Sequence, residues 1–284
     1  IMSTDHKCLW IKALYESGIK EIEVCSFVPS NLMPQMADAS EIVRYSKSLN
    51  KGTVLALTPN LKGAQLAIES GLDKLTVPVS ASEAHSLANV KKTRQEMIFE
   101  VKKIIDYKNQ ISPHVLVEVG ISTAFGCTLQ GTVQESEVIS LAAELANLGV
   151  DDIGLSDTAG YANPAQVRRL FRQLKKNLGE KAGAAHMHNT RGLGLANCLA
   201  AYEEGVRTFD SSQGGLGGCP YAPGASGNVV TEDLVFMFES MGIKTGIDFD
   251  KLLIAREILI SALPNEHIYG MTPLAGLPKG FSFK

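Results

Sequence analysis

Two histidines separated by one residue form the sharpest chemical motif of the sequence, His186 and His188 in "HMH". The motif ends a β-rich run, and alternate residues of a strand point to the same side of a sheet. Two imidazoles on one side make half of a metal site without backbone strain, although lining histidines bonded to backbone carbonyls would show the same spacing. None of the other histidines ends a predicted strand, so the remaining ligands are expected to be oxygens. Oxygen ligands favour an octahedral ion such as Mg²⁺ or Mn²⁺ over tetrahedral zinc.

Carboxylates follow or lie in two other predicted strands. Asp157, in "GLSDTAG", closes the strand before the histidines and is either a general base or metal-shell anchor, or the N-cap of the next helix. Glu23, in "EIEVCSF", points into the fold if Val24 packs outward. Because a buried carboxylate needs a cation or hydrogen-bond donors, Glu23 is expected either to support a neighbouring cation or to take part in the chemistry directly.

A glycine-rich stretch, "QGGLGGCPYAPGASGN", occupies residues 213–228. Its single thiol, Cys219, stands among glycines and a proline rather than aliphatic residues, and could act there as a general acid or a nucleophile. The alternatives are chance placement of the thiol in a lid, and a phosphate cradle built by the glycines. Asn228, at the end of the stretch, is either an oxygen ligand or the N-cap of the helix predicted over "VVTEDLVFMFESM".

Short β-rich runs alternate with longer helical patterns along the chain. Apolar residues recur at helical spacing in 138–148 and 167–178, and Gly18, Gly71, Gly149 and Gly205 precede strands, where helix C-caps belong. This alternation predicts parallel βαβ units. Seven runs are predicted as strands: 19–24, 53–57, 75–79, 115–121, 152–156, 183–188 and 206–211.

The positions of the polar residues decide between two arrangements of these strands. Polar side chains collect where strands end, and in an eightfold barrel those ends meet at one face, whereas a doubly wound sheet would spread them along an edge. We therefore expect an α/β fold, a (β/α)8 TIM barrel with C-terminal helices, whose first strand is missing from this chain. Residues 1–284 are expected to form one catalytic domain, with 229–284 as its helical extension over the site or at a dimer surface.

The composition excludes several classes of function. The 284 residues are 45% hydrophobic and 20% charged with a net charge of −3, which gives no electrostatic reason to expect nucleic acid or an anionic membrane as the partner. No apolar run reaches bilayer length, and the first residues resemble an amphipathic helix rather than a signal peptide. Five scattered cysteines without a CxxC spacing indicate a reducing compartment, and we expect the cytoplasm.

Several blocks of the sequence, taken together, resemble the 3-hydroxy-3-methylglutaryl-CoA lyase family. The blocks are, in order, "EIEVCSFVPSNLMPQMAD", "LTPNLKGAQLAIESG", "IGLSDTAG", "HMHNTRGLGLAN" and "SSQGGLGGCPYAPGASGNVVTEDLVFM". The resemblance covers nearly the whole chain, and the glycine-rich block is its most specific part. The family consists of divalent-metal-dependent TIM barrels that split a 3-hydroxyacyl-CoA by retro-Claisen cleavage.

The resemblance implies roles for individual residues. Three residues match the family's ligands for Mg²⁺ or Mn²⁺: His186, His188 and Asn228. Three others match its catalytic loop cysteine, a catalytic aspartate and a glutamate at the active site: Cys219, Asp157 and Glu23. The resemblance also implies an acyl-CoA thioester as the substrate and a homodimer as the assembly.

The sequence departs from the family pattern in three places. The "RDG" motif of the family's opening strand, with its catalytic arginine and aspartate, does not occur, and we expect an N-terminal stretch outside this sequence to carry it. Asn189 stands after the second histidine where the familiar lyases have aspartate, and Arg191 follows it. Gln213 and Gly214 replace small apolar residues. These four positions could contact the acyl group, so its identity stays open. The tail "GLPKGF" also differs, so no CoA contacts are carried over there.

Two other functions stay open on the sequence. A condensing enzyme of the isopropylmalate or citramalate synthase type shares the barrel, the metal and an HxH motif followed by asparagine, as Asn189 follows it here. The cysteine-bearing glycine stretch and the lack of a large regulatory extension favour the lyase. Outside enzymes, a metal-binding barrel that has lost catalysis would account for the absence of "RDG".

Overall fold

The sheet of this protein contains seven parallel strands that follow one another in chain order. The computed structural model describes residues 1–217 and 227–283. The strands are β1 (Glu21–Ser26), β2 (Thr53–Leu57), β3 (Lys74–Ser80), β4 (Leu116–Ser122), β5 (Asp152–Ser156), β6 (Ala182–His186) and β7 (Phe209–Asp210). The helices are α1 (Thr4–Glu16), α2 (Ala39–Leu49), α3 (Leu61–Glu69), α4 (Glu83–Val90), α5 (Arg94–Ile111), α6 (Glu135–Asn147), α7 (Pro164–Leu178), α8 (Gly194–Glu203), α9 (Thr231–Ser240), α10 (Phe249–Ala262) and α11 (Met271–Ala275).

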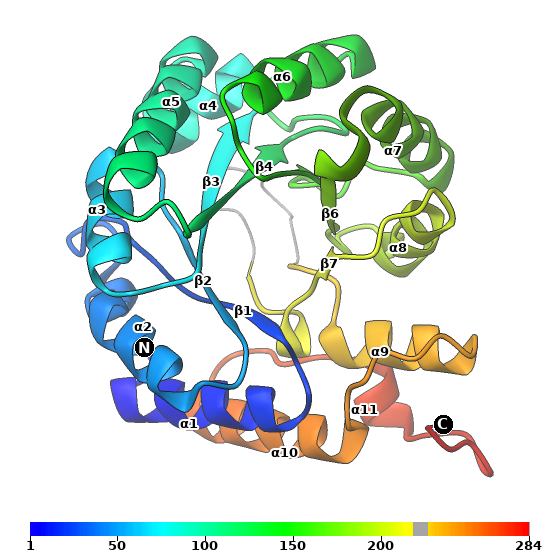
Figure 1. Cartoon of the computed structure of the whole chain (residues 1–284). Coiled ribbons are helices and arrows are strands. Elements are labelled where there is room, and N and C mark those ends of the chain that lie inside the picture. The colour runs from blue at the N-terminus through cyan, green and yellow to red at the C-terminus, as the bar shows by residue number, and fades with distance from the viewer. Residues whose placement is uncertain (218–226, 284) are drawn as a thin grey trace.

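The order of the strands identifies the type of sheet. Each strand pairs in parallel with the next one along the chain, from β1 to β7. A doubly wound sheet reverses its strand order near the middle, and this sheet does not. The strands curl around a centre, and helices α2 to α8 form a ring outside them (Figure 1). The prediction of a barrel built from seven strands in this chain is therefore confirmed.

Local signals in the sequence explain where elements begin and end. Helix α5 starts with a capping box, in which Glu96 N donates to Thr93 Oγ1 at 3.2 Å and Thr93 N donates to Glu96 Oε2 at 2.7 Å. Helix α1 ends at Glu16 with Ser17 as its C-cap, and the next residue, Gly18, has a φ of 102° and would place a Cβ 2.4 Å from Gly246 O. Only glycine fits that position, as the sequence predicted for a helix C-cap.

The two faces of the sheet carry different side chains. On β3 and β4, Val77, Val117 and Val119 are fully buried in the apolar core. The alternate positions carry charges: Lys74 Nζ lies 2.7 Å from Glu21 Oε1 and 2.5 Å from Glu118 Oε2. Because side chains alternate along a strand, the apolar residues face one side of the sheet and the charged residues face the other.

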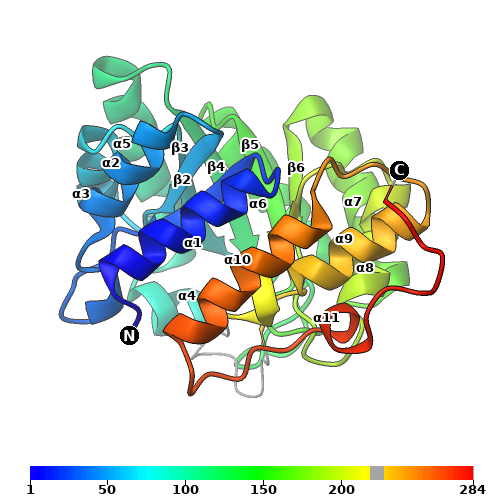
Figure 2. The same ribbon diagram turned by 90° about the horizontal axis from the view of Figure 1, so that it is seen from below.

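Helices from the two ends of the chain pack together. Figures 1 and 2 show α1 and α10 side by side, although α10 begins more than 200 residues after α1. A second apolar cluster joins them: Leu14, Val235, Phe249, Leu252 and Ala255. The residues 229–284 contain α9, α10 and α11, whose assignment as an extension of one domain stays a prediction. Within the described part of the chain, no helix combines the length and the apolar character that a membrane span requires.

Candidate active site

The polar residues that end β5, β6 and β7 lie at the same edge of the sheet. Residue pairing aligns Ser156 with His186 and His186 with Asp210 across the three strands. Asp157 follows β5 directly, and its backbone N–H donates to His186 O at 2.8 Å. In a parallel barrel, this edge is the C-terminal face where active sites form.

The two histidines of "HMH" point to the same side, as their spacing predicted. Met187, between them, is fully buried in the core, whereas the Nε2 atoms of His186 and His188 lie 3.2 Å apart. His186 Nδ1 lies 3.2 Å from Asp210 Oδ2. A carboxylate on the far ring nitrogen fixes the orientation of an imidazole and leaves Nε2 facing the other histidine.

The surroundings give the two imidazoles different pKa values. Burial, together with the neighbouring His186, lowers the pKa of His188 to about 3. Burial also acts to lower the pKa of His186, but the hydrogen bond and negative charge of Asp210 outweigh it and raise the pKa. His188 is therefore neutral at physiological pH, with a nitrogen lone pair available to a cation.

Asn228 lies directly beside His188. The two residues form an antiparallel bridge, and Val229 N donates to Met187 O at 3.1 Å. Asn228 Nδ2 donates to Leu216 O at 2.9 Å, while its Oδ1 is buried without a hydrogen-bond partner among the described residues. Helix α9 begins at Thr231 with Val230 as its N-cap, so the alternative that Asn228 caps this helix is wrong.

Asp157 uses its two carboxylate oxygens differently. Oδ1 accepts from Tyr161 N at 2.7 Å and from Ala162 N at 3.1 Å, while Oδ2 is buried with no partner in the part of the chain that the structure describes. Helix α7 has Asn163 as its N-cap, so Asp157 holds the preceding turn rather than the helix start. Burial raises the pKa of Asp157 to about 6, against the opposing effect of those two hydrogen bonds.

Glu23 lies on the charged face of the sheet. The pairing of β1 with β2 shifts between Glu23 and Cys25, which marks a β-bulge at Val24. Val24 packs against the apolar core and the thiol of Cys25 lies 3.7 Å from Ala39 O, so the bulge turns Glu23 to the opposite side. Although solvent reaches Glu23, the protein atoms around it, together with the charge of Asp210, raise its pKa to about 7.

Histidine nitrogens and an amide oxygen are the donors available to a cation here. In the described ranges, no group of three or more histidine, cysteine, aspartate or glutamate side chains is arranged to hold a metal. Two ligands about 2.1 Å from an octahedral metal and at right angles lie about 3 Å apart, close to the 3.2 Å between the Nε2 atoms. With the unpartnered Asn228 Oδ1 alongside, the donor set fits a divalent cation whose remaining ligands are oxygens.

Three further polar residues belong to the glycine-rich stretch or to β7: Cys219, Gln213 and Asp210. Cys219 lies outside the described residues. Gln213 accepts from Trp10 Nε1 at 2.6 Å and donates to Leu252 O at 2.7 Å, so both polar ends of its side chain are used inside the fold rather than for an acyl group. Asp210 was assigned no role from the sequence, although its place at the end of the last predicted strand was a usable signal.

A cavity of about 530 Å³ opens beside the Asp157 turn. Arg191 reaches it from the segment that follows the histidines, donating to Ala159 O and Gly160 O at 3.0 Å, and its guanidinium lies 4.6 Å from the centre of the Tyr161 ring. The guanidinium and the ring together make this cavity suited to a ligand with an anionic group next to an apolar one.

Comparisons with known proteins agree over most of the chain. A family model described as HMGL-like matches residues 1–259. The hydroxymethylglutaryl-CoA lyase of Bacillus subtilis is 38% identical over 254 residues, which cover 89% of this chain and 84% of that protein. The cytoplasmic 3-hydroxy-3-methylglutaryl-CoA lyase of Mus musculus is 36% identical over 263 residues, 93% of this chain and 76% of that protein.

A solved structure is also similar to this chain. It is an HMG-CoA lyase of Acinetobacter baumannii in complex with coenzyme A and 3-methylmalate, with a TM-score of 0.92 and 39% sequence identity. The match covers 99% of this chain and 91% of that one, so the similarity extends beyond the motifs to the whole arrangement of elements.

Proposed function

The chain belongs to the HMGL-like family, and we propose that it is a divalent-metal-dependent carbon–carbon lyase. Its substrate is 3-hydroxy-3-methylglutaryl-CoA or a similar 3-hydroxyacyl-CoA, cleaved to acetyl-CoA and a 3-oxo acid, which is acetoacetate for the first of these. The relatives named above are lyases, which favours cleavage over the reverse condensation. The bound coenzyme A of the Acinetobacter baumannii protein supports an acyl-CoA thioester as the substrate.

One observation carries this proposal. The Nε2 atoms of His186 and His188, the Oδ1 of Asn228 and the Oδ2 of Asp157 gather at the C-terminal edge of the sheet. The two oxygens are buried without partners among the described residues, and an unpaired buried oxygen costs free energy unless a ligand uses it. A substrate oxygen and a cation are ligands that would satisfy them.

The histidine pair and Asn228 would hold the cation, Mg²⁺ or Mn²⁺. When bound, such a cation polarises oxygens of the substrate and lowers the energy of an alkoxide. Asp210 keeps His186 in the orientation that this role needs, through the contact to Nδ1.

Asp157 is the proposed general base. Its Oδ2 takes the proton of the substrate's 3-hydroxyl, the oxygen–hydrogen electron pair forms the new carbonyl, and the C2–C3 bond breaks. The electron pair of that bond goes to the thioester as an enolate, which takes a proton from the proposed acid, the thiol of Cys219. A pKa of about 6 keeps Asp157 ionised at neutral pH while close enough to it for proton transfer.

Glu23 has a supporting role in this proposal. Its carboxylate interacts electrostatically with both Asp210 and His186, and its pKa of about 7 lets it carry or lose a proton near neutral pH. It therefore adjusts the charge around the His186–Asp210 pair rather than attacking the substrate.

The cell context is part of the proposal. We propose that the reaction belongs to leucine degradation and ketone-body formation, and that the protein is a cytoplasmic homodimer. The scattered cysteines support a reducing compartment, and the relatives include both cytoplasmic and mitochondrial proteins.

The test is an assay of the purified full-length protein with Mg²⁺ or Mn²⁺. We expect acetyl-CoA release from 3-hydroxy-3-methylglutaryl-CoA, abolished by a chelator and restored by either metal. A condensing enzyme would instead release thiol from acetyl-CoA and a 2-oxo acid, which the same preparation also tests. Substituting His188→Ala should abolish turnover, whereas His114→Ala, an exposed histidine before β4, should leave it unchanged. Full activity of metal-free protein would contradict the proposed metal site.

A further inference from the structure

A buried ion pair joins α9 and α10 next to the glycine-rich stretch. Arg256 Nη1 lies 2.8 Å from Glu232 Oε1, and the two side chains are only 6% and 0% exposed. We propose that Arg256 is a positioning residue that holds the start of this stretch, residues 213–217, so that the Asn228 amide oxygen stays beside the histidine pair. The inference rests on the proposed role of Asn228 as a metal ligand.

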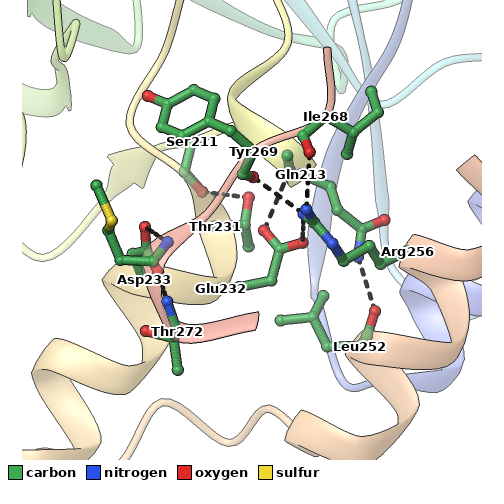
Figure 3. A network of polar contacts seen from close by, with 12 residues as sticks. Ser211, Gln213, Thr231, Glu232, Asp233, Leu252, Arg256, Ile268, Tyr269 and Thr272 are labelled. Carbon is green, nitrogen blue, oxygen red and sulfur yellow. Dashed lines mark hydrogen bonds and ion pairs between the residues drawn. The ribbon is translucent and has the colours of Figure 1, made fainter. Parts of the chain in front are cut away.

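Arg256 and Glu232 connect four segments of the chain. Arg256 Nη1 donates to Tyr269 O at 3.0 Å and Nη2 donates to Ile268 O at 3.1 Å. On the other side of the pair, Glu232 Oε2 accepts from Gly214 N at 3.2 Å. Figure 3 shows the guanidinium between the Glu232 carboxylate and the carbonyls of the 268–269 segment. The pair thus links α9, α10, this segment and the start of the glycine-rich stretch.

The 268–269 segment packs directly on two glycines. Tyr269 N donates to Gly214 O at 3.1 Å. A Cβ on Gly214 would lie 2.3 Å from Ile268 Cγ2, and one on Gly215 would lie 2.3 Å from Tyr269 Cε1. With no space between the two segments, a displacement of 268–269 must also displace 214–215.

Leu216 and Gly217, which follow the two glycines, contact the side chain of Asn228. Its Nδ2 donates to Leu216 O at 2.9 Å and to Gly217 O at 3.4 Å. Because these carbonyls take the amide hydrogens, they fix the rotation of the amide and leave Oδ1 as the free acceptor beside His188. A shift of 216–217 would therefore turn or move the oxygen that faces the histidines.

Arginine is the side chain that can serve all these contacts. Its planar guanidinium offers several donors in a fixed fork, which here meet one carboxylate and two carbonyls. Lysine could replace the charge but not the fork, and methionine could replace only the stem. Removing Arg256 alone leaves Glu232 as a buried charge without its cation, which lowers stability whatever else Arg256 does. The test of a positional role must therefore compare Arg256→Met with a variant that loses stability elsewhere in the fold.

The test is a Mn²⁺ titration of the full-length protein, followed by the electron paramagnetic resonance signal of free Mn²⁺. We expect Arg256→Met to raise the dissociation constant several-fold and up to about 10-fold, the lower limit for losing a group that contacts a metal ligand directly, because Arg256 acts on Asn228 only through the segments between them. The Mn²⁺ dissociation constant of Arg256→Lys should lie between those of the parent and of Arg256→Met. Turnover of the proposed substrate should fall mainly in kcat for both variants.

A control variant that loses stability away from the site separates a positional effect of Arg256 on Mn²⁺ affinity from the effect of a less stable fold. Leu145→Ala removes a fully buried side chain of α6 away from the site, so it should lower the melting temperature without changing Mn²⁺ affinity. Unchanged Mn²⁺ affinity in Arg256→Met, or an equal loss in Leu145→Ala, would overturn the inference.

A second route avoids substituting Arg256, in case that variant does not fold. Gly214→Ala pushes a methyl group against Ile268 and also strains the backbone, because Gly214 has a φ of 66°, so it should weaken Mn²⁺ binding. The added change Ile268→Ala should restore only the part that the clash with Ile268 causes. No restoration in the double variant counts against the inference. The titration needs no substrate, so a parent protein that binds Mn²⁺ but cleaves no thioester contradicts the proposed function and leaves this inference standing. A parent that binds no Mn²⁺ overturns both.

Discussion

At the scale of single residues, two side chains of the proposed site each combine an anchored polar atom with an unpartnered one. Asp157 holds the turn at 161–162 with Oδ1 and keeps Oδ2 unpaired among the described residues. Asn228 likewise anchors itself through Nδ2 and keeps Oδ1 free. In both, the anchored atom fixes the orientation of the free one, which lowers the entropy lost when a ligand binds.

Substituting Asp157→Asn tests this division. Asparagine can keep the Oδ1 acceptor for Tyr161 N and Ala162 N, so the fold should persist, but it cannot take a proton at the second position. We expect kcat to fall by about 100- to 10,000-fold, the range for removing a general base. The measurement is steady-state cleavage of 3-hydroxy-3-methylglutaryl-CoA, with thermal unfolding in parallel.

Asp157→Ala provides the comparison for that experiment. It removes the turn contacts as well, so it should lower the melting temperature more than Asp157→Asn does. If Asp157→Asn turned over substrate at the parent's rate, Asp157 would be a purely structural residue.

At the scale of elements, the charged face of the sheet depends on one lysine. Burial acts to lower the pKa of Lys74, but the carboxylates of Glu118 and Glu21 outweigh it and raise the pKa, so the ammonium stays charged. Lys74 and Glu118 are 8% and 7% exposed, whereas Glu21 is 40% exposed. Lys74 therefore joins β1, β3 and β4 and neutralises the buried carboxylate of Glu118.

Substituting Lys74→Met should lower the free energy of unfolding by up to about 3–5 kcal/mol, because Glu118 loses its buried cation and must either stay charged or take up a proton. Adding Glu118→Gln should recover most of that loss. Denaturant unfolding at pH 7.5 measures both. Equal stability of Lys74→Met and the parent would show that the pair has no structural role.

The pH dependence of this variant has a definite sign. Burial, with the charge of Asp210, raises the pKa of Glu118 to about 7 even with Lys74 present. A carboxyl group whose folded pKa lies above its unfolded value favours the folded state when protonated, and this contribution is lost as the pH rises. The destabilisation by Lys74→Met should thus be smaller at pH 5 than at pH 8.

At the scale of the whole molecule, the contact between α1 and α10 unites the two ends of the chain. Their cluster also contains Val235 of α9, and Trp10 of α1 reaches Gln213 at the start of the glycine-rich stretch. The helices that follow the sheet therefore contact the start of the glycine-rich stretch near the site. They do so through the hydrogen bond of Gln213 to Leu252 O and through the Arg256–Glu232 pair.

Substituting Leu252→Ala tests how much the contact between α1 and α10 contributes to the free energy of unfolding. Leu252 is fully buried in the α1–α10 cluster, so the change should cost about 2–5 kcal/mol of unfolding free energy. Ile254→Ala on the same helix is the matched control, because Ile254 is 60% exposed and its loss should cost about 0.5 kcal/mol or less. A similar loss of unfolding free energy in both variants would mean that Leu252 is not closely packed between α1 and α10.

Much of the barrel could be predicted from the sequence because its signals are local. The strand runs, the helical spacing and the glycine before β1 depend on neighbouring residues, and the structure confirms them with small shifts at the ends. The shared side of His186 and His188 was predictable for the same reason, since the alternation of a strand spans only two residues.

The tertiary structure decided what depends on residues far apart in the chain. It placed Asp210 on His186 and Asn228 beside His188, and it removed the helix-cap alternatives for Asn228 and Asp157. It also directed Gln213 into the fold, whereas Cys219 stays a prediction. No local pattern encodes these contacts, because they arise only when the curled sheet and the helices after it bring distant segments within hydrogen-bonding distance.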